Sequence, residues 1–152
     1  MSPEDICYKI STATFDDVLQ HLVKCNENFI PALNEKVDIK AYSQKIAKNS
    51  ITFEAWINDE LSGLIAAYFN DGEKKKGFIT NVSTIKAYSG KGIASQLMEM
   101  CISYGVRHKF GEITLEVFQY NKSAIQLYKK YGFHQTGDKD NLVIMKRKLS
   151  EL

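Results

Sequence analysis

Residues 78–94 read FITNVSTIKAYSGKGIA, and this stretch does most to decide the fold. An apolar, β-prone run ends in Ser89, Gly90, Lys91 and Gly92, and the helix-like pattern IASQLMEMCISYGV follows at once. The sequence therefore predicts a strand, a glycine loop and the start of a helix. Such a junction presents unpaired N–H groups at the positive end of a helix dipole, and its glycines allow close approach of a ligand. We expect this loop to bind an anion such as a pyrophosphate.

Apolar periodicity and turn residues predict the other elements on either side of this junction. Helices are expected after Thr14 and Asp38, and over residues 92–107 and 121–131. Strands are expected over residues 7–11, 51–57, 61–69, 77–85, 112–118, 133–136 and 142–148. The order β, α, α, β, β, β, α, β, α, β, β predicts a mixed α/β (α+β) sheet with helices on its faces.

Bulk composition is that of an ordinary globular protein, and we expect residues 1–152 to form a single domain. The chain has 20 basic and 18 acidic residues, for a net charge of +2, which does not favour a nucleic-acid partner. Nothing near the N-terminus resembles a signal peptide, and no apolar run is long enough to cross a membrane.

Cysteine and histidine spacing gives no support for a disulfide framework or a metal site. Cys7, Cys25 and Cys101 are far apart, and the three histidines do not share the spacing of metal ligands. We therefore expect no bound metal and a reducing compartment, the cytoplasm.

The glycine loop departs from two familiar nucleotide-binding motifs. Ser95 stands where G-x-G-x-x-G needs its third glycine, which disfavours a Rossmann dinucleotide site. A Walker A motif is also absent, because Lys91 lacks the preceding glycine spacing and is followed by Gly92 instead of Ser or Thr.

The sequence beyond the long helix is more specific. Residues 115–117 read LEV, and residues 121–133 read NKSAIQLYKKYGF. Together with the glycine loop, these segments closely resemble the GNAT-type N-acetyltransferases, with their R/Q-x-x-G-x-G/A loop and N-x-x-A-x-x-L-Y-x-x-x-G-F segment. The resemblance covers roughly residues 78–133. It departs at Ser89, where the family usually has Arg or Gln before the first glycine.

This resemblance implies a mostly antiparallel central sheet of about seven strands with helices on both faces, and acetyl-CoA as cosubstrate. The backbone of Val82, Ser83 and Thr84 would pair with the pantetheine arm, to which Asn121 would also hydrogen-bond. Asn121 is equally placed to cap a helix. The pyrophosphate would lie on the loop formed by Gly90, Lys91, Gly92, Ile93, Ala94 and Ser95.

The resemblance also implies roles for two side chains. Tyr128 would protonate the leaving thiolate, although its position on an apolar helical stripe is equally that of a core residue. Glu116 alternates out of phase with the apolar residues of its strand and would take the proton from the attacking amine. A half-exposed sheet residue is the alternative. Glu54, which interrupts another apolar strand, is a rival base.

The implied function is direct transfer of an acetyl group to a primary amine in a ternary complex. The acceptor is expected to be a small molecule, such as an amino sugar or polyamine, or a protein N-terminus. It should contact residues of the first two helices and their loop, including Asn28, Phe29, Glu35 and Tyr42, and residues of the final hairpin. A non-catalytic acyl-CoA-binding regulatory module is the alternative, and the resemblance also allows a homodimer.

Overall fold

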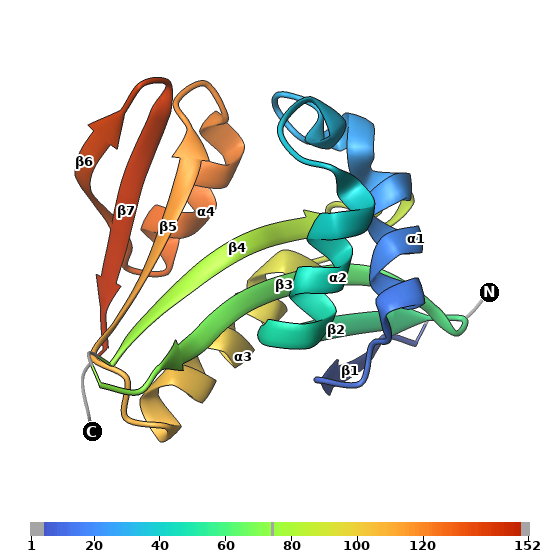
Figure 1. The fold of residues 1–152 in the computed structure, drawn as a ribbon, viewed down its shortest axis with the longest axis horizontal. Coiled ribbons are helices and arrows are strands. Elements are labelled where there is room, and N and C mark those ends of the chain that lie inside the picture. The colour runs from blue at the N-terminus through green and yellow to red at the C-terminus, as the bar shows by residue number, and fades with distance from the viewer. Residues whose placement is uncertain (1–4, 74, 150–152) are drawn as a thin grey trace.

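The computed structural model describes residues 5–73 and 75–149, and within them the predicted order of elements is confirmed (Figure 1). The strands are β1 (Cys7–Ile10), β2 (Ile51–Ile57), β3 (Glu60–Asp71), β4 (Lys76–Thr84), β5 (Glu112–Phe118), β6 (His134–Lys139) and β7 (Leu142–Lys148). The α-helices are α1 (Phe15–Cys25), α2 (Ile39–Asn49), α3 (Ile93–Arg107) and α4 (Lys122–Lys130). Three short 3₁₀ turns were not predicted: η1 (Asn26–Asn28), η2 (Leu33–Glu35) and η3 (Lys86–Tyr88).

Helix starts follow the capping residues in the sequence. Thr14 and Asp17 form a reciprocal capping box at the start of α1, in which each backbone N–H is bonded by the other side chain. The Asp38 side chain accepts a hydrogen bond from the Ala41 N–H at the start of α2. These local bonds explain why the helix starts could be predicted from the sequence.

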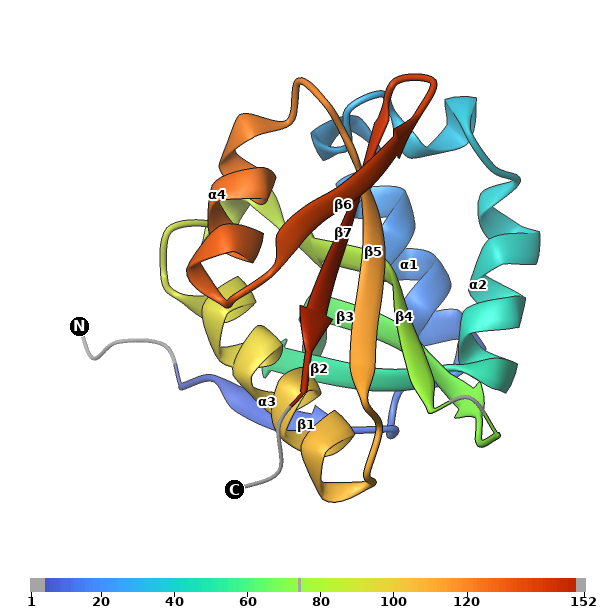
Figure 2. The same cartoon turned by 90° about the vertical axis from the view of Figure 1, so that its left-hand side faces the viewer.

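The described strands form one seven-stranded sheet in the order β1-β2-β3-β4-β5-β7-β6. All neighbours are antiparallel except β4 and β5, which are parallel and are connected through α3 (Figure 2). The expected mixed, mostly antiparallel sheet is therefore confirmed. The last strand, β7, lies inside the sheet between β5 and β6, so the C-terminal hairpin completes one half of it.

Helices cover both faces of the sheet, and each face has its own core (Figures 1 and 2). The larger core lies under α3 and α4 and includes Phe53, Leu97 and Met145. The smaller core lies under α1 and α2 and includes Leu22 and Ile46. Alternate residues of the central strands contribute to opposite cores, which fixes the face from which each strand side chain points.

The sheet opens between β4 and β5 (Figure 1). These strands pair from Lys76 opposite Glu112 to Ile79 opposite Leu115, and the ladder ends there. In β4 the pairing with β3 jumps from Ile79 to Asn81, so Thr80 is the extra residue of a β-bulge. A bulge bends its strand and increases the local twist. The bulge therefore coincides with the point where β4 turns away from β5.

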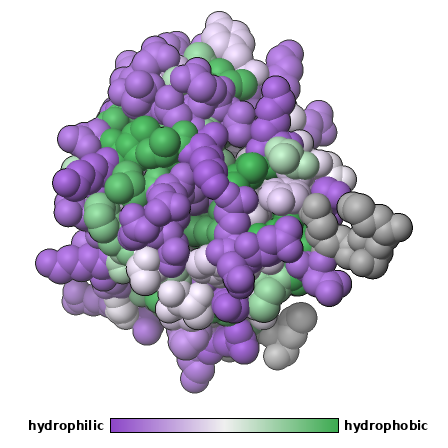
Figure 3. Space-filling model, turned by 90° about the vertical axis from the view of Figure 1, so that its right-hand side faces the viewer, coloured by the Kyte–Doolittle hydropathy of each residue, from purple (hydrophilic) through white to green (hydrophobic). Residues whose placement is uncertain are grey.

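Figure 3 shows the side of the molecule that carries α1. Hydrophilic atoms cover most of this side, and apolar atoms gather in a patch toward its upper left. Among the described residues, no helix combines the length and the apolar character that crossing a bilayer requires.

Candidate active site

A cavity of about 300 Å³ lies where β4 and β5 part. It reaches both faces of the sheet, because its walls come from β4, β5, β7, α2, α4 and the segment between α1 and α2. The lining residues are Phe29, Ile30, Leu33, Lys36, Val37, Tyr42, Phe78, Ile79, Thr80, Asn81, Val82, Glu116, Val117, Phe118, Asn121, Tyr128 and Leu142. The opening in the sheet thus brings together residues from distant parts of the sequence.

Tyr128 belongs both to the core and to this cavity. Its side chain is only 7% exposed and packs near Phe133 in the larger core, yet it also lines the cavity. Burial raises the pKa of its phenol to about 12, so the hydroxyl stays protonated at neutral pH. Tyr128 is therefore a buried, protonated phenol in the lining of the cavity.

Asn121 lines the cavity from the start of α4. Its side-chain oxygen accepts a hydrogen bond from the Ala124 N–H at 3.3 Å, which caps the helix. Within residues 5–73 and 75–149, the side-chain nitrogen of Asn121 has no hydrogen-bond partner. The cap therefore holds the amide while leaving its N–H groups for a ligand.

Glu116 lies on β5 with its side chain exposed, between the buried Leu115 and Val117. It faces the α1 and α2 side of the sheet and lines the cavity. Glu116 and Tyr128 are therefore brought to one cavity from opposite faces of the sheet.

Glu54 does not line this cavity; it is fully buried on β2 and bonded on both carboxylate oxygens. It accepts hydrogen bonds from the backbone and hydroxyl of Thr12, from the Ala13 N–H at 3.0 Å, from Thr52 Oγ1 at 2.5 Å and from Trp56 Nε1 at 3.0 Å. Burial acts to raise the pKa of this carboxyl, but these donors outweigh it and the pKa is lowered. This geometry does not favour Glu54 as a rival base and supports a structural role instead, because its hydrogen bonds tie the segment before α1 to the sheet.

The glycine loop forms a second hollow of about 260 Å³. Gly90 and Gly92 have φ values of +80° and +78°, and a Cβ added to either would project into open space. Both positions favour glycine because other residues rarely adopt such angles. The hollow is lined by Thr84, Tyr88, Ser89, Gly90, Gly92, Ile93, Ala94 and Ser95. Lys91 is exposed and is not part of this lining.

The edge of β4 beyond Ile79 continues toward the glycine loop. Val82 lines the cavity and Thr84 lines the glycine hollow, so this edge connects the two. Ser83 is 8% exposed, and its hydroxyl points into the α1 side of the sheet. Residues 80–84 have no ladder partner on β5, which leaves this strand edge for the backbone groups of a ligand.

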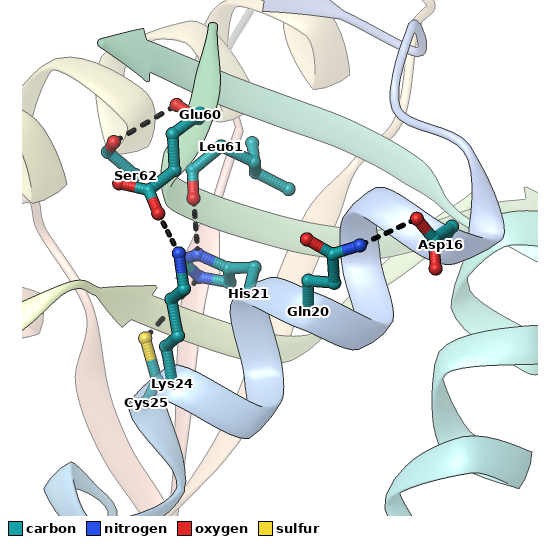
Figure 4. Close-up of polar contacts among 8 residues, drawn as sticks. All are labelled: Asp16, Gln20, His21, Lys24, Cys25, Glu60, Leu61 and Ser62. Carbon is teal, nitrogen blue, oxygen red and sulfur yellow. Dashed lines mark hydrogen bonds and ion pairs between the residues drawn. The ribbon is translucent and has the colours of Figure 1, made fainter. Parts of the chain in front are cut away.

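Sequence reasoning missed a buried polar chain that ends at the cavity. His21 of α1 is 1% exposed; its Nδ1 donates to the Leu61 carbonyl oxygen at 2.9 Å (Figure 4), and its Nε2 lies 2.8 Å from Ser83 Oγ. Ser83 Oγ also lies 2.8 Å from the side-chain amide of Asn81, which lines the cavity. Burial lowers the pKa of His21 to about 4, so the ring is neutral. The polar residues Asn81 and Ser83, which interrupt an apolar strand, were the sequence feature that could have indicated this polar chain.

Other expectations about the acceptor side are met in part. Phe29 and Tyr42 line the cavity, whereas Asn28 and Glu35 do not. Leu33 and Leu142 also line it, from the loop and the final hairpin where acceptor contacts were expected, whereas Phe118 was not anticipated. In the described residues, no group of three or more His, Cys, Asp or Glu side chains could hold a metal ion.

The chain belongs to the GNAT family of acetyltransferases. The family model matches residues 15–133, which include α1, the bulged β4, the glycine loop and Tyr128. The resemblance seen in the sequence is thereby confirmed.

Curated relatives match part of the chain, and they include the following two. N-alpha-acetyltransferase MAK3 of Arabidopsis thaliana is 33% identical over 84 residues, which are 55% of this chain and 44% of the relative. Spermine/spermidine N(1)-acetyltransferase of Bacillus subtilis (strain 168) is 28% identical over 79 residues, 51% of this chain and 52% of the relative. The matched segments thus span about half the length of these relatives.

Solved structures match the fold along almost the whole chain. PH1933 from Pyrococcus horikoshii OT3 aligns with a TM-score of 0.77 at 22% identity, covering 96% of this chain and 99% of that one. The PaiA N-acetyltransferase from Thermoplasma acidophilum, solved in complex with coenzyme A, aligns with a TM-score of 0.72 at 15% identity, covering 93% and 99%. At these identities the likeness establishes the fold.

Proposed function

We propose that this protein is an acetyl-CoA-dependent N-acetyltransferase that moves an acetyl group directly to a primary amine. The observation that carries the proposal is the opening between β4 and β5, whose cavity is lined by both Tyr128 and Glu116 and whose unpaired β4 edge continues to the glycine hollow. A cofactor and an acceptor can meet there from opposite faces of the sheet.

The residues of the opening fit coenzyme A. Main-chain N–H groups at the start of α3 suit a diphosphate, because they combine unpaired donors with the positive end of the helix dipole. The unpaired edge at Val82 and Thr84 suits the amides of a pantetheine arm, and the Asn121 side chain offers further donors. Bound there, acetyl-CoA would supply the thioester-activated acetyl group.

Two side chains would handle the protons. Glu116 would accept the proton released by the attacking amine, directly or through water, and Tyr128 would donate a proton to the leaving sulfur. A main-chain N–H of residues 82–84 would polarise the acetyl carbonyl, as an oxyanion donor does. Holding both substrates in line would supply the largest share of the rate enhancement.

The amine class of the acceptor is supported by what the relatives are named for. One is an N-alpha-acetyltransferase and the other acts on spermine and spermidine. Both acceptor types carry a primary amine, which must be deprotonated before it attacks the acetyl carbon.

The proposal is tested by release of free CoA from acetyl-CoA in the presence of a panel of amines and peptides, with acetylated products identified by mass spectrometry. We expect at least one amine to give turnover above the hydrolysis background. Binding of acetyl-CoA without turnover across the panel would instead support a non-catalytic acyl-CoA-binding module.

A further inference from the structure

One wall of the cavity is apolar. Phe29, Leu33 and Val37 reach it from the segment between α1 and α2, while Phe118 and Leu142 face them from β5 and β7. Phe118 lies opposite Leu142 in the ladder, so these two side chains form a continuous apolar wall. An acceptor that enters beside Glu116 must contact these side chains.

Part of the apolar surface of this wall is exposed to solvent. Phe29, Val37, Phe118 and Leu142 are half-buried in the protein alone. Covering their remaining surface with an apolar group of a ligand removes that surface from water, which favours binding. A polar or charged group in the same place would lose hydration without gaining a partner.

The charged residues of the cavity lining favour an acceptor with a single amine. Among the described residues that line it, Glu116 carries the one negative charge and Lys36 the one positive charge. Glu116 can attract a single ammonium group. Lys36 is exposed and therefore lies at the rim, where it repels a second ammonium on the same molecule.

We propose that the acceptor is a primary monoamine that carries an apolar substituent, and that polyamines are poor acceptors. This inference rests on the proposed function and narrows its substrate class. The shared chemistry of one amine beside an apolar group is offered both by free alkyl or aryl amines and by peptides with an apolar N-terminal residue.

A matched pair of substrates tests the proposal. Hexylamine and hexane-1,6-diamine have the same chain length and differ only by the second amine. We expect kcat/KM for acetyl transfer to be at least tenfold higher for hexylamine, and calorimetric binding to the enzyme–CoA complex to follow the same order. Equal or better use of the diamine, or of spermine, would overturn the proposal.

A charge reversal gives a second, independent test. Lys36→Glu should raise kcat/KM for hexane-1,6-diamine at least fivefold, because the rim then attracts its second ammonium. Lys40→Glu makes the same charge change at an exposed position outside the cavity and should alter the ratio of the two substrates by less than twofold. A ratio unchanged by Lys36→Glu would contradict the role of the rim charge.

A peptide arm distinguishes the two sources of the acceptor. Tetrapeptides that begin with Leu or Phe are compared with otherwise identical peptides that begin with Asp or Lys, and with phenethylamine. Preference for the apolar peptides over phenethylamine supports a protein N-terminus, and the reverse supports a free amine. If no amine or peptide is acetylated although acetyl-CoA binds, the proposed function itself fails. Turnover that prefers diamines overturns this inference alone.

Discussion

The phenolic hydroxyl of Tyr42 donates a hydrogen bond to the main-chain carbonyl oxygen of Thr80 at 2.7 Å and lies 2.9 Å from the Thr80 hydroxyl. Tyr42 belongs to α2, and Thr80 is the extra residue of the bulge in β4. Helix α2 is therefore fastened to the sheet at the residue where β4 turns away from β5. We expect the width of the opening to depend on this contact.

Replacing Tyr42 by Phe should weaken acetyl-CoA binding about fivefold. The variant loses a hydrogen bond worth about 1 kcal/mol and leaves the Thr80 carbonyl without this donor. Isothermal calorimetry with coenzyme A measures the effect. Tyr8→Phe, on the distant edge strand β1, is the matched control and should bind normally. Normal binding by Tyr42→Phe would show that the bulge holds its shape without α2.

Tyr128→Phe should lower kcat at least tenfold and change the affinity for coenzyme A by less than twofold. The substitution removes the proton donor but keeps the ring that packs near Phe133. Steady-state kinetics and calorimetry give the two quantities. Tyr131→Phe alters a tyrosine that directly follows the same helix and lies outside the cavity lining, and it should retain full activity. Equal kcat in both variants would remove Tyr128 from the mechanism.

Glu116→Gln and Glu54→Gln should affect different properties, the first the turnover rate and the second the stability of the fold. Glu116→Gln removes the proposed base and should lower kcat at least tenfold without affecting the melting temperature. Glu54→Gln places an amide among five donors and should cost about 2 kcal/mol of stability, while kcat per folded molecule stays within twofold. Urea titration and kinetics on the same samples separate the two. A large loss of kcat in folded Glu54→Gln would restore Glu54 as the base.

Gly92→Ala should weaken coenzyme A binding by roughly five- to tenfold. A φ of +78° costs an alanine about 1 kcal/mol or more, and the loop relieves this strain by leaving its binding conformation. Gly72→Ala, on an exposed turn where a Cβ meets nothing within 4 Å, is the control and should bind coenzyme A normally. The idea fails if the two variants bind equally well.

The buried His21 should make stability fall in mild acid. Its pKa is about 4 in the folded protein and 6.5 when unperturbed, so the unfolded chain takes up the proton first as pH falls. Stability from the neutral ring is therefore complete above pH 6.5 and is lost toward pH 4, by up to about 3 kcal/mol. The difference in unfolding free energy between wild type and His21→Gln should shrink over this range.

His134→Gln, on the exposed edge strand β6, serves as the control for this pH series. It should keep the pH dependence of the wild type. The difference in unfolding free energy between wild type and His21→Gln could also stay constant from pH 7 to pH 4. The folded protein would then protonate His21 as readily as the unfolded chain does, and its pKa would not be lowered.

Local signals made much of the fold predictable. The capping residues Thr14 and Asp38 and the glycines of the loop act on their own neighbours in sequence, so they can be read without knowing the fold. The glycine loop and the segment 121–133 also carry the family resemblance. These are the parts in which sequence and structure agree most closely.

What could not be predicted depends on partners far apart in the chain. His21 and Ser83 are separated by 62 residues, and no periodicity reveals their contact. The two carboxylates at Glu54 and Glu116 look alike in sequence, since each interrupts an apolar strand. Only the packing of β1 and the segment after it beside β2 surrounds Glu54 with donors and leaves Glu116 open.

The parallel ladder described above joins β1–β4 to β5–β7 along a short seam at residues 76–79 and 112–115. The two halves of the sheet are therefore joined by backbone hydrogen bonds near one end only. The larger core extends across this seam, because it contains Phe53 of β2 together with Val117 of β5 and Met145 of β7. Packing therefore holds the two halves together beyond the point where their backbone pairing ends.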